Sequence, residues 1–169
     1  MRPADVEELD RGDPGEVALE TALRKARAAR EFVRTEAGAT GAEVVLGCDT
    51  LVALDGAIYG KPSDEREALE TLRALGGVVH EVVSGLALLL PDGERTAIAC
   101  TKVAFRVFDE ALLDWYLATG EWRGRAGGYA IQGAGAALVR KVEGDYENVV
   151  GLPLAVLLDI YPELLFACK

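Results

Sequence analysis

The segment Gly47-Cys48-Asp49-Thr50 interrupts a strongly apolar stretch with a carboxylate and a hydroxyl group. Burying a carboxylate among apolar side chains costs several kcal/mol unless a partner compensates for it. At the end of an apolar strand, Asp49 and Thr50 can point into a cleft, where they suit a divalent metal ion or an activated water molecule. The alternative is a structural Asp that caps its own backbone. The local sequence leaves both interpretations open.

Cationic side chains occur in two short segments that contain glycine. Lys61 lies between Gly60 and Pro62, and such a restrained loop can hold a point charge next to a phosphate group. The segment RGRAGG contains Arg125 and a flexible backbone whose N–H groups can approach phosphate oxygens closely. Each segment can also be an ordinary surface loop. Neither matches a P-loop or a dinucleotide-binding fingerprint.

An isolated amide and the single histidine are further candidates. Gln132 follows the apolar run 129–131, and its amide can donate and accept hydrogen bonds at once. That pattern complements the ring N–H and the adjacent carbonyl of uracil or thymine, although a hydrogen bond to neighbouring backbone is the alternative. His80 alternates with Val78 and Val82, which favours a partly buried structural histidine over a catalytic one.

The elements that must position these side chains mix helical and strand patterns. Helical spacing and end signals predict helices over residues 16–37, 63–75, 109–117 and, with Pro153 near the first turn, 148–166. Apolar runs and turn residues predict strands over 44–54, 57–59, 78–90, 94–108 and 136–142. Asp55-Gly56 and Pro91-Asp92-Gly93 predict hairpins. We therefore expect an α/β fold with a mixed sheet and flanking helices, as a single domain over residues 1–169.

Composition limits the classes of partner. The chain has 169 residues, of which 50% are hydrophobic, enough for one domain with a substantial core. A net charge of −10 argues against nucleic acid and anionic membranes as partners, but not against a small phosphorylated ligand. The sequence contains no apolar run of membrane-spanning length and no secretion signal. Three scattered cysteines form no disulfide or metal pattern, so we expect a cytoplasmic protein.

Three longer segments, in this order, resemble the Maf family of nucleoside triphosphate pyrophosphatases. Residues 47–62, GCDTLVALDGAIYGKP, are similar to the family's G-[AC]-D-T-V…GKP segment. Residues 72–88, LRALGGVVHEVVSGLAL, are similar to its L-x-G-x-x-H-x-V-x-[TS]-G segment. Residues 125–154, RAGGYAIQGAGAALVRKVEGDYENVVGLPL, are similar to its AG-x-Y-x-I-Q-G…Y-x-N-V-V-G-L-P segment. The resemblance covers nearly the whole chain.

The resemblance implies a fold related to that of inosine triphosphatases, with a cleft between two lobes. It implies hydrolysis of a nucleoside triphosphate to the monophosphate and pyrophosphate with a divalent cation, Mg²⁺ or Mn²⁺. It also implies a homodimer. The Gln in Y-x-I-Q-G is typical of the branch that acts on dTTP and UTP, with modified pyrimidine nucleotides as a wider expectation, whereas a Glu there is typical of the branch that acts on 7-methyl-GTP.

The resemblance also assigns roles by position. Asp49 matches the proposed general base, and it can instead, or in addition, be a metal ligand. Thr50 and Gln132 match positions tied to substrate choice. Lys61 matches a lysine near the phosphates, and Arg125 stands where many members carry Lys. Glu8 matches an acidic residue of the site, which would help to hold the metal.

One departure from the family pattern keeps other functions open. Members usually begin with a strand and a loop reading L-A-S-x-S-P-R-R, and this segment does not precede the matched stretch here. One interpretation is an ordinary enzyme whose gene start has been assigned too far downstream. The alternative is a non-catalytic or impaired nucleotide-binding regulator of septum formation. A third interpretation is an enzyme that removes the non-standard purine nucleotides ITP or XTP (purine house-cleaning), but Gln132 argues against it.

Overall fold

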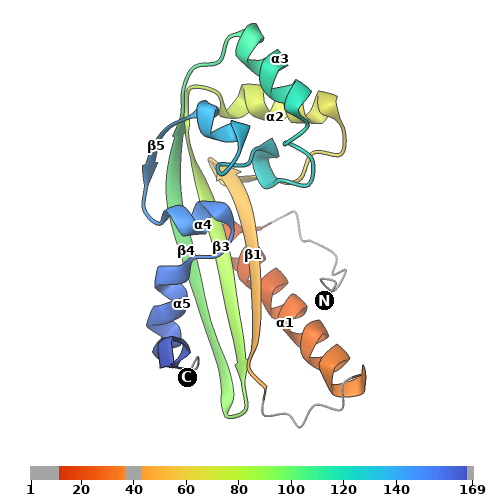
Figure 1. Cartoon of the computed structure of the whole chain (residues 1–169), viewed down its shortest axis with the longest axis vertical. Coiled ribbons are helices and arrows are strands. Elements are labelled where there is room, and N and C mark those ends of the chain that lie inside the picture. Colours follow the sequence, from red (N-terminus) through yellow and green to blue (C-terminus); the bar gives the residue numbers. More distant parts are fainter. Residues whose placement is uncertain (1–11, 37–42, 167–169) are drawn as a thin grey trace.

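The computed structural model describes residues 12–36 and 43–166 (Figure 1). Its α-helices are α1 (Pro14–Glu36), α2 (Glu65–Leu75), α3 (Glu110–Thr119), α4 (Tyr146–Val150) and α5 (Leu154–Ile160). Its strands are β1 (Val45–Leu54), β2 (Ala57–Tyr59), β3 (Val79–Leu90), β4 (Gly93–Phe105) and β5 (Val139–Glu143). Short 3-10 helices are η1 (Ala126–Gly128), η2 (Ala134–Leu138) and η3 (Pro162–Phe166).

The described strands form one sheet in the order β2-β1-β3-β4-β5, and every neighbouring pair is antiparallel. The predicted α/β class with flanking helices is confirmed. The sheet differs from the expected mixed one, because no parallel pairing occurs among the described strands. The short turns of the β1–β2 and β3–β4 hairpins make these two pairs antiparallel, and the long connections return β3 beside β1 and β5 beside β4 in the antiparallel direction as well.

Both predicted hairpin turns are confirmed. Asp55 and Gly56 adopt positive φ angles of 50° and 79°, which a two-residue turn between right-twisted strands requires. In the second hairpin, Leu90 pairs with Gly93, so that Pro91 and Asp92 form the turn. These turns fix the register of β1 against β2 and of β3 against β4. In the β1–β3 pairing, Asp49 lies opposite Gly85.

Helix α1 packs unusually closely on the face of the sheet formed by β1 and β3. Its buried stripe consists of small residues such as Ala18, Ala22 and Ala26. A Cβ on Gly47 would lie 2.2 Å from the carbonyl oxygen of Ala22, and one on Gly85 would lie 2.4 Å from the carbonyl carbon of Ala18. The two glycines therefore provide the space in which the helix backbone lies directly on the strands.

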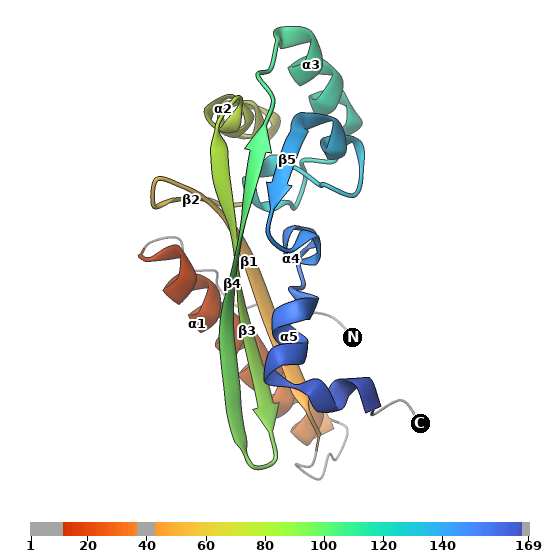
Figure 2. The same cartoon turned by 90° about the vertical axis from the view of Figure 1, so that its left-hand side faces the viewer.

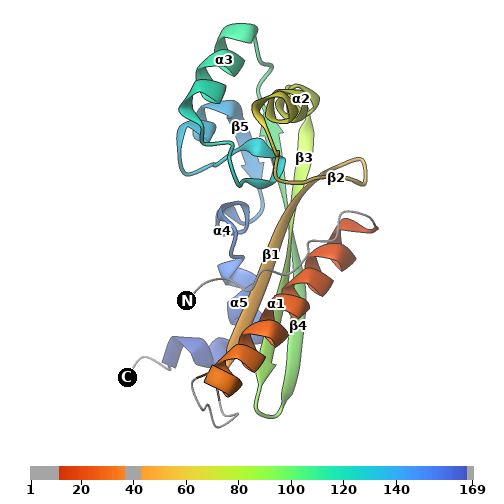
Figure 3. The ribbon, with the colours of Figure 1, turned by 90° about the vertical axis from the view of Figure 1, so that its right-hand side faces the viewer.

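The molecule has two ends of different construction (Figures 1 and 2). At one end, α1 covers one face of β1, β3 and β4, and α5 lies on the opposite face. The other end, where α2, α3 and β5 gather, contains the largest cluster of buried apolar side chains, including Leu72, Phe105, Tyr116 and Trp122. This arrangement agrees with the expected two lobes (Figure 3).

Two predicted elements near the C-terminal end are different in the structure. The helix expected over 148–166 is divided into α4, α5 and η3, because Gly151 adopts φ 124° and Pro153 follows it. Pro153 precedes the first residue of α5, as its predicted place near a helix start requires. The strand expected over 136–142 is η2 up to Leu138, and β5 starts at Val139. None of the helices in residues 12–36 and 43–166 is long and apolar enough to cross a membrane.

Candidate functional site

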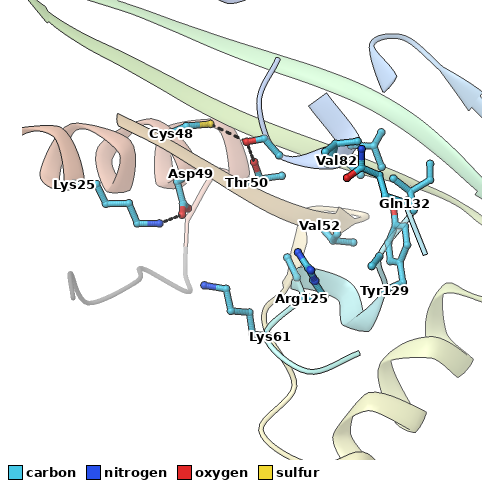
Figure 4. Close-up of a pocket in the computed structure, with 17 residues that line it drawn as sticks. Lys25, Cys48, Asp49, Thr50, Val52, Lys61, Val82, Arg125, Tyr129 and Gln132 are labelled. Carbon is cyan, nitrogen blue, oxygen red and sulfur yellow. Dashed lines mark hydrogen bonds and ion pairs between the residues drawn. The ribbon is translucent and has the colours of Figure 1, made fainter. Parts of the chain in front are cut away.

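A cavity of about 280 Å³ lies where the two lobes meet, and we call it the main cavity (Figure 4). Its lining includes the five described residues that the resemblance assigned to the site, together with one lysine that the sequence analysis did not consider. These residues are Lys25, Asp49, Thr50, Lys61, Arg125 and Gln132. They come from α1, β1, the loop after β2 and the loops around η1. The fold thus brings distant segments to one place, while the role of each residue stays a prediction.

Asp49 and Thr50 lie on opposite faces of β1. The Asp49 carboxylate faces α1, where it accepts a hydrogen bond from Lys25. Thr50 Oγ1 shares a hydrogen bond of 2.7 Å with Ser84 Oγ and donates to the Gly151 carbonyl oxygen at 3.4 Å, on the side of α4. This separation follows from strand alternation, which sends successive side chains to opposite faces.

Both side chains can still border one cavity because of where β1 lies in the sheet. The short strand β2 pairs only with Val52–Leu54 of β1. In the described part of the chain, the preceding residues of β1 therefore form an edge of the sheet. The main cavity borders this edge, and residues from both faces line it.

Lys25 is the site residue that the sequence reasoning missed. Its ammonium forms an ion pair with Asp49, and the Asp49 side chain is only 5% exposed against 26% for that of Lys25. A nearby cation offsets the cost of burying a carboxylate, which answers the question that the apolar surroundings of Asp49 raise. The sequence pattern that could have identified Lys25 is its helical spacing, because Lys25 follows Ala18 and Ala22 on the stripe of α1 that faces the sheet.

The cysteine next to Asp49 lies in surroundings that disfavour its thiolate form. Cys48 Sγ donates a hydrogen bond to the Gly151 carbonyl oxygen at 3.3 Å. Burial raises the pKa of the Cys48 thiol to about 11. Because the thiolate is the reactive form of cysteine, this burial disfavours covalent chemistry at Cys48.

Two linked loops carry the cationic residues of the opposite wall. Lys61 lies in the loop after β2, and Arg125 lies just before η1. The N–H group of Gly127 donates to the carbonyl oxygen of Gly60 at 3.0 Å, and this bond connects the two loops. Gly127 has φ 65°, and a Cβ there would lie 2.8 Å from Val52 Cγ2, so only glycine allows the loop to lie against β1.

The backbone that carries Gln132 is anchored by buried aromatic side chains. Tyr129 and His80 share a hydrogen bond of 3.0 Å between the phenol oxygen and Nε2. The Ala130 N–H donates to the Tyr116 hydroxyl at 3.3 Å. The side chain of Gln132 itself is exposed and has no hydrogen bond to any residue in the described part of the chain. A rigid backbone therefore presents an amide that is available to a ligand.

His80 should make the stability of the fold depend on pH. Burial lowers the pKa of His80 to about 4, whereas the unfolded chain keeps an ordinary value of about 6.5. Between these values the unfolded chain binds a proton that the folded chain does not. The contribution of neutral His80 to the free energy of unfolding is therefore complete above pH 6.5 and is lost as the pH falls towards 4. The loss is about 1.4 kcal/mol per pH unit and about 3 kcal/mol in all.

Urea unfolding at pH 7, 5.5 and 4.5 measures this loss. Because carboxylates also titrate in acid, the comparison is with His80→Gln, which has no imidazole to protonate. The parent should lose about 2 to 3 kcal/mol more than the variant over this range. Equal losses in the two proteins would contradict the assignment to His80.

The described residues fit a metal ion only together with a phosphorylated ligand. No group of three or more His, Cys, Asp or Glu side chains within residues 12–36 and 43–166 could hold a metal. Mg²⁺, however, commonly takes one or two carboxylates and completes its shell with water and substrate phosphates. Asp49 meets that requirement at the cavity wall. Glu8, the other predicted metal ligand, lies outside the described residues.

Comparison with known proteins adds independent findings. A family model described as "Maf-like protein" matches residues 1–164. The dTTP/UTP pyrophosphatase of Pyrococcus furiosus is 41% identical over 162 residues, which cover 95% of this chain and 82% of that protein. The dTTP/UTP pyrophosphatase of Anaeromyxobacter dehalogenans is 45% identical over 159 residues, or 92% and 77% of the two chains. That of Deinococcus radiodurans is 41% identical over 154 residues, or 91% and 75%.

Proposed function

The chain belongs to the Maf-like protein family, and we propose that it hydrolyses dTTP and UTP to the nucleoside monophosphate and pyrophosphate. The observation that carries this proposal is the main cavity. It gathers one carboxylate, three cationic side chains and one available amide, as Asp49, Lys25, Lys61, Arg125 and Gln132. The cationic side chains can neutralise the charge of a triphosphate, and the carboxylate can activate water for its hydrolysis. The amide can form hydrogen bonds with a pyrimidine base.

The reaction is an attack of water on the α-phosphorus. A bond forms from the water oxygen to phosphorus, the bond from phosphorus to the bridging oxygen breaks, and pyrophosphate leaves with that oxygen. Asp49 takes the proton of the attacking water as general base. Asp49 is suited to this role by its position at the wall of the main cavity, where it lies beside Lys25.

The cationic side chains stabilise the charge that moves onto the leaving group. Lys61 and Arg125 come from the two linked loops, on the wall opposite Asp49 (Figure 4). Fixed cations that face a developing negative charge lower the barrier, because they need no reorganisation during the reaction. Lys25 adds a third positive charge from α1.

A divalent cation, Mg²⁺ or Mn²⁺, belongs to the proposal. Asp49, with Glu8 as a second carboxylate and the phosphate oxygens of the substrate, would hold it. When bound, such an ion lowers the pKa of water and neutralises phosphate charge. Asp49 then acts as a metal ligand, as the general base, or as both.

Gln132 is proposed to select the base. Its amide can donate to a carbonyl oxygen of uracil or thymine while it accepts from the ring N–H. The Gln132→Glu substitution replaces this pair with a carboxylate, which only accepts and therefore suits the paired donors of guanine. We expect kcat/KM for UTP to fall roughly 10- to 100-fold, because one polar edge of the base loses its partner. The value for 7-methyl-GTP should rise.

Pyrophosphate release measures this change, with inorganic pyrophosphatase added to convert the product to phosphate for a colorimetric reading. The matched control is Gln132→Met, which keeps the size but removes both hydrogen bonds. It should lower the rate with UTP without raising that with 7-methyl-GTP. A Gln132→Glu variant with unchanged preference would refute the assigned role.

The same assay tests the function as a whole, with UTP, dTTP, GTP and ITP as substrates. Faster hydrolysis of UTP and dTTP supports the proposal. Binding of UTP in calorimetry without product would favour the non-catalytic regulator of septum formation. A preference for ITP would favour purine house-cleaning. Either of these results would overturn the proposed reaction.

We further propose a cytoplasmic homodimer that binds neither nucleic acid nor membranes. Cys48 and Cys100 are free thiols, which suits a reducing compartment. The net charge of −10 opposes binding to polyanions. Exposed apolar side chains on consecutive segments, Val150, Leu152 and Leu154, offer a surface for a second copy. Sedimentation equilibrium measures the oligomeric state.

A further inference from the structure

Glu121 lies behind the loop that carries Gln132, directly after α3. Its backbone N–H donates to Thr119 Oγ1 at 3.2 Å, which ties it to the end of the helix. Its carboxylate accepts a hydrogen bond of 2.7 Å from the N–H of Ala134. A Cβ on Gly133 would lie 2.3 Å from Glu121 Oε2. The carboxylate therefore covers Gly133 and holds the residue after it.

Gln132 lies in a tight turn that is fixed at both ends. The N–H of Gly133 donates to the carbonyl oxygen of Ala130 at 3.1 Å, which closes the turn. On one side, the Ala130 N–H is held by the Tyr116 hydroxyl. On the other side, Glu121 holds Ala134. Because the Gln132 side chain is exposed, the direction of its amide depends on this backbone.

A second cavity, of about 290 Å³, distinguishes the position of Glu121 from that of Gln132. Its lining consists of Glu121, Arg123, Arg125, Ala130, Gln132 and Gly133. Gln132 and Arg125 border both cavities, whereas Glu121 does not line the main cavity. Glu121 is therefore placed to act on a nucleotide in the main cavity through the loop that it holds.

We propose that Glu121 is a positioning residue for base selection, whose carboxylate fixes the backbone of Gly133 and Ala134 and thereby aims the amide of Gln132. The identity of the selected base rests on the function proposed above. A hydrogen bond from a backbone N–H to a carboxylate is stronger than one between neutral groups, and Glu121 is partly shielded from water. Without this hydrogen bond, the turn should adopt several orientations. Binding of a base that needs the Gln132 amide in one orientation should then weaken more than binding of other bases.

The test compares Glu121→Ala, which removes the acceptor, with Glu121→Gln, whose amide oxygen can accept from the same N–H. Glu70→Ala is the control, because Glu70 lies on α2 in an exposed ion pair with Arg66. With UTP and GTP as substrates, we expect Glu121→Ala to lower the UTP-to-GTP ratio of kcat/KM about 10-fold. The change should lie in KM for UTP, with kcat altered less than about 3-fold. Glu121→Gln should restore most of the ratio, and Glu70→Ala should keep it.

An unchanged ratio in Glu121→Ala would overturn the proposal. So would a parallel loss of kcat with both nucleotides in Glu121→Ala and Glu121→Gln, because that result describes a purely structural residue. Amide hydrogen exchange gives a reading independent of turnover: the Ala134 N–H should exchange faster in Glu121→Ala and not in Glu121→Gln. Equal protection of Ala134 in parent and Glu121→Ala would contradict the proposed anchor.

The two proposals fail in different ways. A parent protein that hydrolyses neither UTP nor dTTP refutes the proposed reaction. The inference about Glu121 is then decided by calorimetry of UTP and GTP with a chelator present, where the same shift in the affinity ratio is expected. A parent that turns over UTP, combined with an unchanged ratio in Glu121→Ala, refutes only the inference about Glu121.

Discussion

Replacing Asp49 by Asn should lower kcat/KM for UTP about a thousandfold while the protein remains folded. Asn has the same shape but a negligible affinity for protons, so the water loses its base. It also carries no charge, so a metal ion loses a ligand. The side chain is 5% exposed and faces Lys25 at the wall of the main cavity, where no other carboxylate of the described residues lies.

Rates with UTP, measured by pyrophosphate release, check this expectation, and circular dichroism with thermal unfolding checks the fold. The control is Asp92→Asn in the exposed turn between β3 and β4, which should keep the parent rate. Assays across a range of Mg²⁺ separate the two roles of Asp49. A defect that excess metal relieves identifies a ligand, and one that it does not relieve identifies a base. Unchanged activity in the Asp49→Asn variant would contradict the proposed mechanism.

Replacing Gly85 by Ala should destabilise the fold by about 3 kcal/mol, at the upper end of the effects of overpacking a core. A Cβ there would lie 2.4 to 2.5 Å from backbone atoms of Ala18 and Leu19 on α1. Backbone cannot turn aside as a side chain can, so the helix must move away from the sheet. Because Gly85 pairs with Asp49 and α1 carries Lys25, the same movement separates the ion pair.

Urea unfolding followed by circular dichroism measures the loss, and nucleotide turnover should decline with it. Gly60→Ala is the matched control, since a Cβ at Gly60 meets nothing within 4 Å. It should change the free energy of unfolding by less than about 0.5 kcal/mol. A Gly85→Ala protein as stable as this control would mean that α1 does not rest on β3 in the way described.

Features governed by near neighbours in the chain were predictable from the sequence. Asp55-Gly56 and Pro91-Asp92 each formed the expected turn, because turn residues act through their own φ and ψ angles. Helix α2 was expected over 63–75 and spans Glu65–Leu75. The resemblance to a family, carried by segments in a fixed order, predicted the class of fold and the activity named for the relatives.

Features that depend on distant partners were not predictable in this way. The antiparallel order of the whole sheet follows from how its long connections return, and no local pattern reports this. Helical spacing puts Lys25 on the apolar stripe of α1, but only the placement of the helix on β1 shows that Asp49 is its partner. Asp49 and Thr50 both line the main cavity, as expected, but the local sequence did not show that they reach it from opposite faces of β1. The chemical roles of all these residues stay predictions.

The hydrogen bond from Gly127 to Gly60 has a consequence for product release. The loops that carry Lys61 and Arg125 are joined by it, so we expect the two cations to withdraw from pyrophosphate together rather than in sequence. Both contacts would then be broken in one opening event. We therefore expect a single loop movement to accompany the release of pyrophosphate, the step that follows chemistry.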